Sequence, residues 1–160
     1  MIVLKDLRGL YLNNAKCKVQ SEKCKMQNGK AKKETEMKIP NKLSERFEEF
    51  AAGVIKGIAK IQRNFAGRHI AGQLIRSATS AGANYEEACG AESRQDFIHK
   101  LQTVLKELRE SLFWMRVSLR ADLLAIEIVR PLLKEGHELA NIIGKSVLTS
   151  KRGISVRKRT

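Results

Sequence analysis

Apolar residues recur at helical spacing through the second half of the chain. Between residues 93 and 120, two series keep a strict seven-residue repeat, and with Phe97 and Val104 they cover an arc of about 120° on a helical wheel. Such a repeat keeps one stripe of a helix facing its partners, so this segment has to bury that stripe against other helices. The two series are Ile98, Leu105, Leu112 and Leu119, and Leu101, Leu108 and Met115.

Three further segments have helical periodicity. Residues 44–65 have apolar residues in steps of three and four, with Ser44 as N-cap and with Asn64 and Gly67 as a stop signal. Residues 70–88 are rich in small side chains, which predicts close packing, and residues 131–148 begin at Pro131, which suits a first helical turn. Four amphipathic segments with short connections predict an all-α fold, an antiparallel up-down-up-down four-helix bundle over residues 41–149.

Composition excludes several other classes. A length of 160 residues suits one domain, and aromatic residues at 5% with only two prolines argue against a β-sandwich. No uncharged run reaches the roughly 18–20 residues that span a membrane. Charges at Lys5, Asp6 and Arg8 interrupt the apolar start before it could form a secretory signal. The chain is therefore expected in the cytoplasm, away from membranes.

The formal net charge of +14 is concentrated at the two ends. Residues 1–40 contain ten basic and four acidic residues, residues 41–150 contain sixteen and thirteen, and residues 151–160 contain five and none. We therefore expect flexible basic tails, an arm over residues 1–40 and a C-terminal tail over residues 150–160. Such tails commonly bind nucleic acid. The basic residues of the C-terminal tail are Lys151, Arg152, Arg157, Lys158 and Arg159.

The segment 93–120 also separates its charges outside the apolar stripe. One flank is basic and the other is acidic, and three further apolar residues lie outside the stripe in the C-terminal half. We interpret the basic flank as a nucleic-acid contact, and the acidic and apolar residues as a self-association surface. The basic flank comprises Lys106, Arg109, Arg116 and Arg120. The predicted oligomer interface comprises Phe113, Trp114, Val117, Glu107 and Glu110.

No pattern of reactive side chains points to catalysis. Cys17 and Cys24 lack a zinc spacing, and the three histidines lie far apart in sequence. There is no phosphate-binding loop and no nucleophile motif. We expect no enzyme activity, no metal, no cofactor and no small-molecule substrate. A polar cluster of Ser80, Asn84 and Glu87 fits structural hydrogen bonding better than catalysis.

Three segments carry a resemblance to a known family. They are Gln73–Ser80, Asn84–Ala88 and Asp96–Leu101, and the last is followed by Lys106–Ser111 and Phe113-Trp114. The motif residues are Gln73, Arg76, Ser77 and Ser80 in the first segment, and Asn84 and Glu87 in the second. In this order and spacing the chain resembles the bacterial four-helix bundles named for proteins encoded in 23S ribosomal RNA intervening sequences. The resemblance covers residues 41–149.

The resemblance implies a small antiparallel bundle that assembles as a pentameric ring. It also implies nucleic acid, with RNA favoured, as the partner. Residues 1–36 have no counterpart in this family, and Met37 resembles its usual start, so two interpretations of these residues stay open: a translated arm or an upstream extension.

The combined prediction is a non-enzymatic homo-oligomer that binds nucleic acid through basic residues with low sequence specificity. The alternative is an interaction scaffold with a partner protein, such as an accessory subunit of a reverse transcriptase. In that case Phe113 and Trp114 would anchor the partner.

Overall fold

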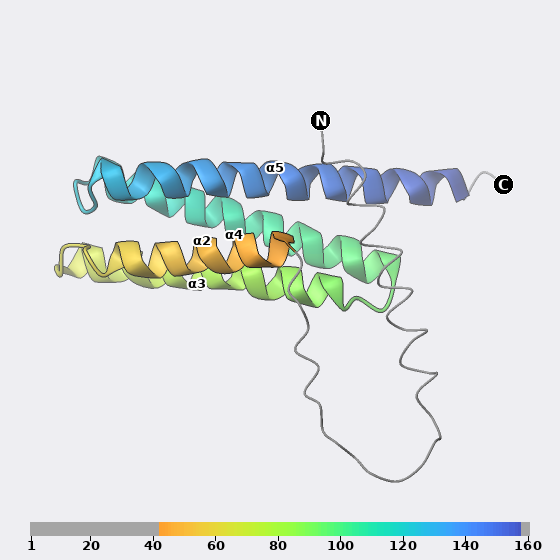
Figure 1. Ribbon diagram of the computed structural model, residues 1–160, viewed down its shortest axis with the longest axis horizontal. Helices are drawn as coiled ribbons and strands as arrows, with labels where there is room; N and C mark the ends of the chain where they lie inside the picture. Colours follow the sequence, from red (N-terminus) through yellow and green to blue (C-terminus); the bar gives the residue numbers. More distant parts are fainter. Residues whose placement is uncertain (1–41, 158–160) are drawn as a thin grey trace, which may run out of the picture. The chain divides into compact units, whose positions relative to one another are not determined.

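The described part of the chain forms four helices joined end to end. The structure is a computed structural model, which describes the backbone of residues 42–157 and the side chains of residues 42–151. In chain order the helices are α2 (Lys42–Ile58), α3 (Phe65–Cys89), α4 (Arg94–Arg120) and α5 (Ile126–Arg157). Each helix runs antiparallel to the next, and α2 also contacts α5 (Figure 1). The predicted all-α bundle is confirmed; the predicted N-terminal arm lies outside the described residues.

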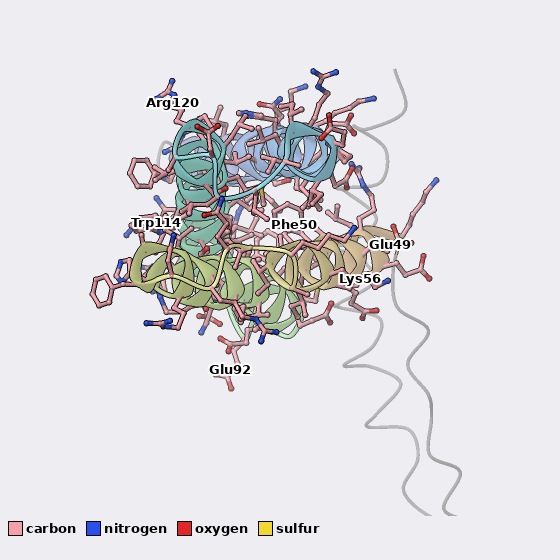
Figure 2. The ribbon with its side chains drawn as sticks, turned by 90° about the vertical axis from the view of Figure 1, so that its left-hand side faces the viewer. Glu49, Phe50, Lys56, Glu92, Trp114 and Arg120 are labelled. Carbon is pink, nitrogen blue, oxygen red and sulfur yellow. The ribbon has the colours of Figure 1, made fainter. Side chains whose placement is uncertain are left out.

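The core forms where the predicted stripes of all four helices meet. Leu101, Leu108 and Met115, one of the two seven-residue series of α4, are fully buried. Phe47 of α2 stacks on Tyr85 of α3 with ring centroids 4.8 Å apart. Figure 2 shows Phe50 between the helices, whereas Glu49 and Lys56 lie on the outside of α2. The helical periodicity therefore predicts correctly which sides of the helices are buried.

The small residues of α3 lie in the closest-packed part of the bundle. Ser77, Ala78 and Ala81 have no exposed surface. The Ser111 hydroxyl of α4 donates to the Ser77 hydroxyl at 2.9 Å, so the two helices approach within the reach of two short side chains. Close packing, as predicted for this segment, is the reason that small residues occur here.

The boundary between the first two helices was wrongly predicted. Asn64 does not end a helix over residues 44–65; α2 ends at Ile58, and Asn64 is the N-cap of α3. Its side chain accepts a hydrogen bond from the Gly67 backbone N–H at 2.7 Å. A Cβ atom at Gly67 would lie 1.9 Å from the Gln62 carbonyl oxygen. Gly67 therefore permits the chain to approach itself at a helix start, and α3 begins at residue 65 rather than 70.

The last helix is longer than predicted at both ends. α5 begins at Ile126, so Pro131 lies inside the helix rather than at its first position. Because proline has no backbone N–H, Pro131 cannot donate to the carbonyl of Glu127, four residues before it. Pro131 and Glu127 are both exposed, so water can donate to this carbonyl instead. At the other end α5 continues to Arg157, past the predicted bundle boundary at residue 149. The segment 150–157 is therefore helical, and residues 158–160 lie outside the description.

An ion pair joins the first and last helices of the bundle. Arg46 Nε donates to Glu135 Oε1 at 2.7 Å, and Arg46 Nη2 donates to Glu138 Oε2 at 2.9 Å. The hydrogen bond that Arg46 donates to the Glu135 carboxylate holds the pKa of Arg46 above its usual value. Because Glu135 and Glu138 are engaged with α2, they lie away from the side of α5 that faces α4.

Candidate nucleic-acid interface

A groove runs between α4 and α5 on the surface of the bundle. Its volume is about 620 Å³, and its apolar lining comes from both helices. We call it the α4–α5 groove. Its lining residues are Leu105, Arg109, Leu112 and Arg116 of α4, and His137, Ala140, Asn141, Gly144, Lys145 and Leu148 of α5.

The charge of the α4–α5 groove is entirely positive. Arg109 and Arg116 of α4 face Lys145 of α5, and no acidic residue lines the groove. Within the described residues, none of these three cations has a hydrogen bond or an ion pair to another side chain. Three unpaired cations around one depression create a positive potential that attracts an anionic partner.

The remaining basic residues of α4 extend this charge along the outer surface of the helix. Lys106 and Arg120 are exposed, and Figure 2 shows Arg120 pointing away from the bundle. With Arg109 and Arg116 they form a line along α4, which we call the cationic stripe. The structure thus places all four predicted α4 residues on one side of this helix, and two of them line the α4–α5 groove.

The predicted C-terminal basic residues are only partly described. Lys151 is exposed on α5, seven residues after Gly144, so it lies on the same side of the helix as the groove. Arg152 and Arg157 lie in the last two turns of α5, and their side chains are outside the description. Lys158 and Arg159 lie beyond the described residues.

The acidic flank of α4 is engaged inside the chain. Nη1 of Arg76 in α3 lies 3.8 Å from Oε2 of Glu107, and Nη2 of Arg76 donates to Oε1 of Glu110. Glu107 Oε2 is buried and has no hydrogen-bond partner among the described residues, so Arg76 provides its nearby positive charge. The sequence indicated an intersubunit role for these acids; the structure places them in the contact between α3 and α4.

Trp114 is less exposed than the sequence suggested. It is half-buried against the core where α4 meets α3 (Figure 2). Its indole Nε1 donates to Glu110 Oε1 at 3.3 Å, and its ring meets the edge of His69 with centroids 5.8 Å apart. Phe113 contacts the Trp114 ring and remains 49% exposed. Of the predicted apolar interface residues, Phe113 is therefore the most exposed, because Val117 also packs partly against the core.

The motif residues of α3 serve the contact with α4 rather than a separate site. Gln73 Oε1 accepts from Arg76 at 3.2 Å, and Ser77 donates to the Gln73 carbonyl at 2.8 Å. Glu87 pairs with Lys100 of α4 and raises the pKa of Lys100 above its usual value. Asn84 donates to the Ser80 backbone carbonyl at 2.9 Å, so Ser80, Asn84 and Glu87 do not converge on one point.

Sequence reasoning missed the part of the groove that α5 supplies. His137, Asn141 and Lys145 follow one another at four-residue spacing, which places them on one side of a helix. That spacing was visible in the sequence, but it indicates a surface only when the neighbouring helix is known. Among the described residues, no group of three or more His, Cys, Asp or Glu side chains could hold a metal ion. None of the described helices is long and apolar enough to cross a membrane.

Comparison with known protein families gives a match over most of the described bundle. The profile of the 23S rRNA-intervening sequence protein family matches residues 41–145. The chain belongs to this family. A crystal structure of a protein from the S23 ribosomal protein family of Bacteroides thetaiotaomicron is similar to it, with 30% identity and a TM-score of 0.59, over 66% of this chain and 97% of that one. Among curated proteins no significant match was found. The family match spans α2, α3, α4 and the groove residues of α5 up to Lys145.

Proposed function

We propose that this member of the 23S rRNA-intervening sequence family binds RNA without catalysing a reaction. The α4–α5 groove and the cationic stripe would contact backbone phosphates. Phosphates are the same for every nucleotide, so contacts to them position a nucleic acid without reading its sequence. The proposal therefore includes low sequence specificity, and RNA is the nucleic acid that the family resemblance favours.

The observation that carries the proposal is the set of unpaired cations in the α4–α5 groove. Elsewhere in the described bundle, Arg46, Arg76 and Lys100 are held by carboxylates of neighbouring helices, and other exposed cations, such as Lys56 and Lys60, lie outside the groove. Arg109, Arg116 and Lys145 instead converge on one depression with no acid in its lining. Cations that are not neutralised within the chain remain available to displace the counterions of a polyanion, which is the main source of non-specific nucleic-acid affinity.

The direct test removes these three charges together. We expect Arg109→Gln/Arg116→Gln/Lys145→Gln to bind a fluorescein-labelled single-stranded RNA at least tenfold more weakly than the parent chain, because each lost phosphate contact weakens binding. Fluorescence anisotropy at fixed salt measures the affinity. The side chains are exposed or half-buried, so the fold should be retained, and circular dichroism checks this.

The matched control is Lys56→Gln/Lys60→Gln/Arg63→Gln. It lowers the net charge by the same amount at exposed positions around the end of α2 and the turn after it. We expect this variant to bind RNA nearly as well as the parent. Equal losses in the two variants would show that only total charge matters, and the proposed site would then be wrong.

A second candidate rests on the apolar floor of the same groove. Leu105 and Leu112 line it, and Leu148 is 60% exposed at its end. An acidic amphipathic helix of a partner protein could place apolar residues on this floor and carboxylates beside the arginines. This is the scaffold alternative. It would gain support if Arg109→Gln/Arg116→Gln/Lys145→Gln, the groove variant, bound RNA as well as the parent chain does.

Self-association as a ring is a further part of the proposal. Repetition of a weak site around a ring raises the total affinity for one long RNA strand. The predicted interface residues do not form one free surface, since Glu107 and Glu110 are paired with Arg76. We therefore propose the oligomer without assigning its contact surface.

A further inference from the structure

One aromatic side chain lies in the middle of the cationic stripe. Phe113 is 49% exposed on α4. Arg109 precedes it by four residues and Arg116 follows it by three, which are the spacings of nearest neighbours on one side of a helix. Lys106 and Arg120 lie seven residues away on either side, on the same side of α4. An exposed ring is therefore bordered by cations along the helix in both directions.

The ring of Phe113 is supported by its neighbour on α4. It meets the indole of Trp114 edge-on, with centroids 5.0 Å apart and an interplanar angle of 73°. Trp114 is itself held by His69 and by its hydrogen bond to Glu110. Because its neighbour is fixed in this way, Phe113 has fewer rotamers available than an isolated surface side chain. Little conformational entropy is then lost when a ligand packs against the ring.

We propose that Phe113 is a stacking platform for an unpaired base of the bound RNA. This inference rests on the proposed function and narrows its substrate class to single-stranded RNA. Every base has a flat π-face, so stacking adds affinity without sequence preference, while flanking cations hold the phosphates on either side. In a duplex these faces are already stacked on neighbouring bases, so a double-stranded RNA cannot use Phe113 in this way.

The surroundings of Phe113 favour RNA over a protein partner at this position. The central part of a protein interface is depleted in charged residues and contains a cluster of apolar side chains. Around Phe113, the neighbours on the outer side of α4 are four cations, and the nearby apolar residues Trp114 and Val117 are partly buried in the bundle. A single exposed ring among cations is the arrangement found where single-stranded nucleic acid binds.

The experiment compares two probes that differ only in their bases. One is a single-stranded RNA of about 20 nucleotides, long enough to cover a typical single-strand site. The other is an abasic oligomer of the same length, with the same phosphates and no bases. We expect Phe113→Ala to bind the RNA roughly tenfold more weakly, as alanine substitution at base-stacking aromatics does, and to bind the abasic oligomer as the parent does.

Two further variants separate stacking from simple apolar contact. Phe113→Trp keeps a flat ring and should keep the affinity for RNA, whereas Phe113→Leu keeps apolar volume and should lose it as Phe113→Ala does. Ile55→Ala is the matched control, because Ile55 is 47% exposed on α2, away from the stripe. It should change neither affinity.

Several outcomes would overturn the inference. They are equal RNA affinity of Phe113→Ala and the parent, full RNA affinity of Phe113→Leu, and a lower oligomeric mass of Phe113→Ala by light scattering. If Phe113→Ala matches the parent while the groove variant still loses affinity, stacking is wrong and phosphate binding stands. If the parent binds neither probe, the proposed function fails as well.

Discussion

At the residue scale, single glycines decide how closely the helices pack. A Cβ atom at Gly136 of α5 would lie 3.0 Å from Leu112 Cδ2 and 3.1 Å from Phe50 Cε2. Both neighbours are buried in the core, so neither can move aside without disturbing other contacts. Gly136 therefore permits a close approach of α5 to α2 and α4, and a side chain at this place would require Leu112 and Phe50 to shift by a few tenths of an ångström.

Alanine at this position should destabilise the bundle. Overpacking a core typically costs about 1–3 kcal/mol, which exceeds the gain of up to about 1 kcal/mol from the helix propensity of alanine. We expect Gly136→Ala to lower the midpoint of urea unfolding. Gly72→Ala of α3 is the control, since nothing lies within 4 Å of its Cβ position, and it should raise the midpoint. If both variants are more stable than the parent, this account of Gly136 is wrong.

The roles of individual glycines could not be predicted from the sequence alone. Gly67 and Gly136 look alike in the sequence, and Gly67 resembled a helix stop because glycine often follows a helix. Its actual role depends on the carbonyl oxygen of Gln62, whose position is set by the turn between α2 and α3. A glycine in a sequence indicates that the backbone has an unusual conformation or a close neighbour. Which atom lies too close for a side chain is known only from the three-dimensional structure.

At the element scale, Arg76 couples α3 to α4. Its partner Glu107 has a largely buried carboxylate, with a side chain 18% exposed. We expect Arg76→Gln to lower the free energy of unfolding by about 1–2 kcal/mol, because a buried carboxylate loses its nearby cation while Arg76 itself is half exposed.

A double-mutant cycle isolates this contact. Glu107→Gln removes the charge that Arg76 neutralises, so adding it to Arg76→Gln should recover part of the lost stability. Urea unfolding of the two single variants and of the double variant measures the coupling. Strictly additive effects would mean that the ion pair contributes nothing to the contact between α3 and α4.

The helices themselves differed in how well the sequence predicted them. α4 was predicted almost to the residue, because a long seven-residue repeat and the N-cap Ser93 both mark it; the Ser93 hydroxyl accepts from the Asp96 N–H. The sequence predicts a helix start at Pro131, because proline suits a first helical turn, whereas α5 begins five residues earlier at Ile126. Periodicity identifies the buried side of a helix well, whereas the ends depend on turns and on hydrogen bonds that water can replace.

At the scale of the whole molecule, the site forms only when two helices lie side by side. The sequence identified Arg109 and Arg116 on the flank of α4, but not Lys145, which reaches the same groove from α5. It also placed Glu107 and Glu110 on a free surface, although Arg76 of α3 neutralises them. Charge segregation on one helix is visible in a sequence; which neighbour covers each flank follows from the arrangement of the bundle.

In the proposed complex, cations of the α4–α5 groove contact RNA phosphates. The most direct test is the salt dependence of binding to a single-stranded RNA, for the parent chain and for Arg109→Gln/Arg116→Gln/Lys145→Gln. Each phosphate contact contributes about −0.7 to the slope of log Kobs against log salt concentration for a single strand. We predict a slope shallower by about 2 for the variant, since about three contacts are lost. A slope equal to that of the parent would contradict the claim.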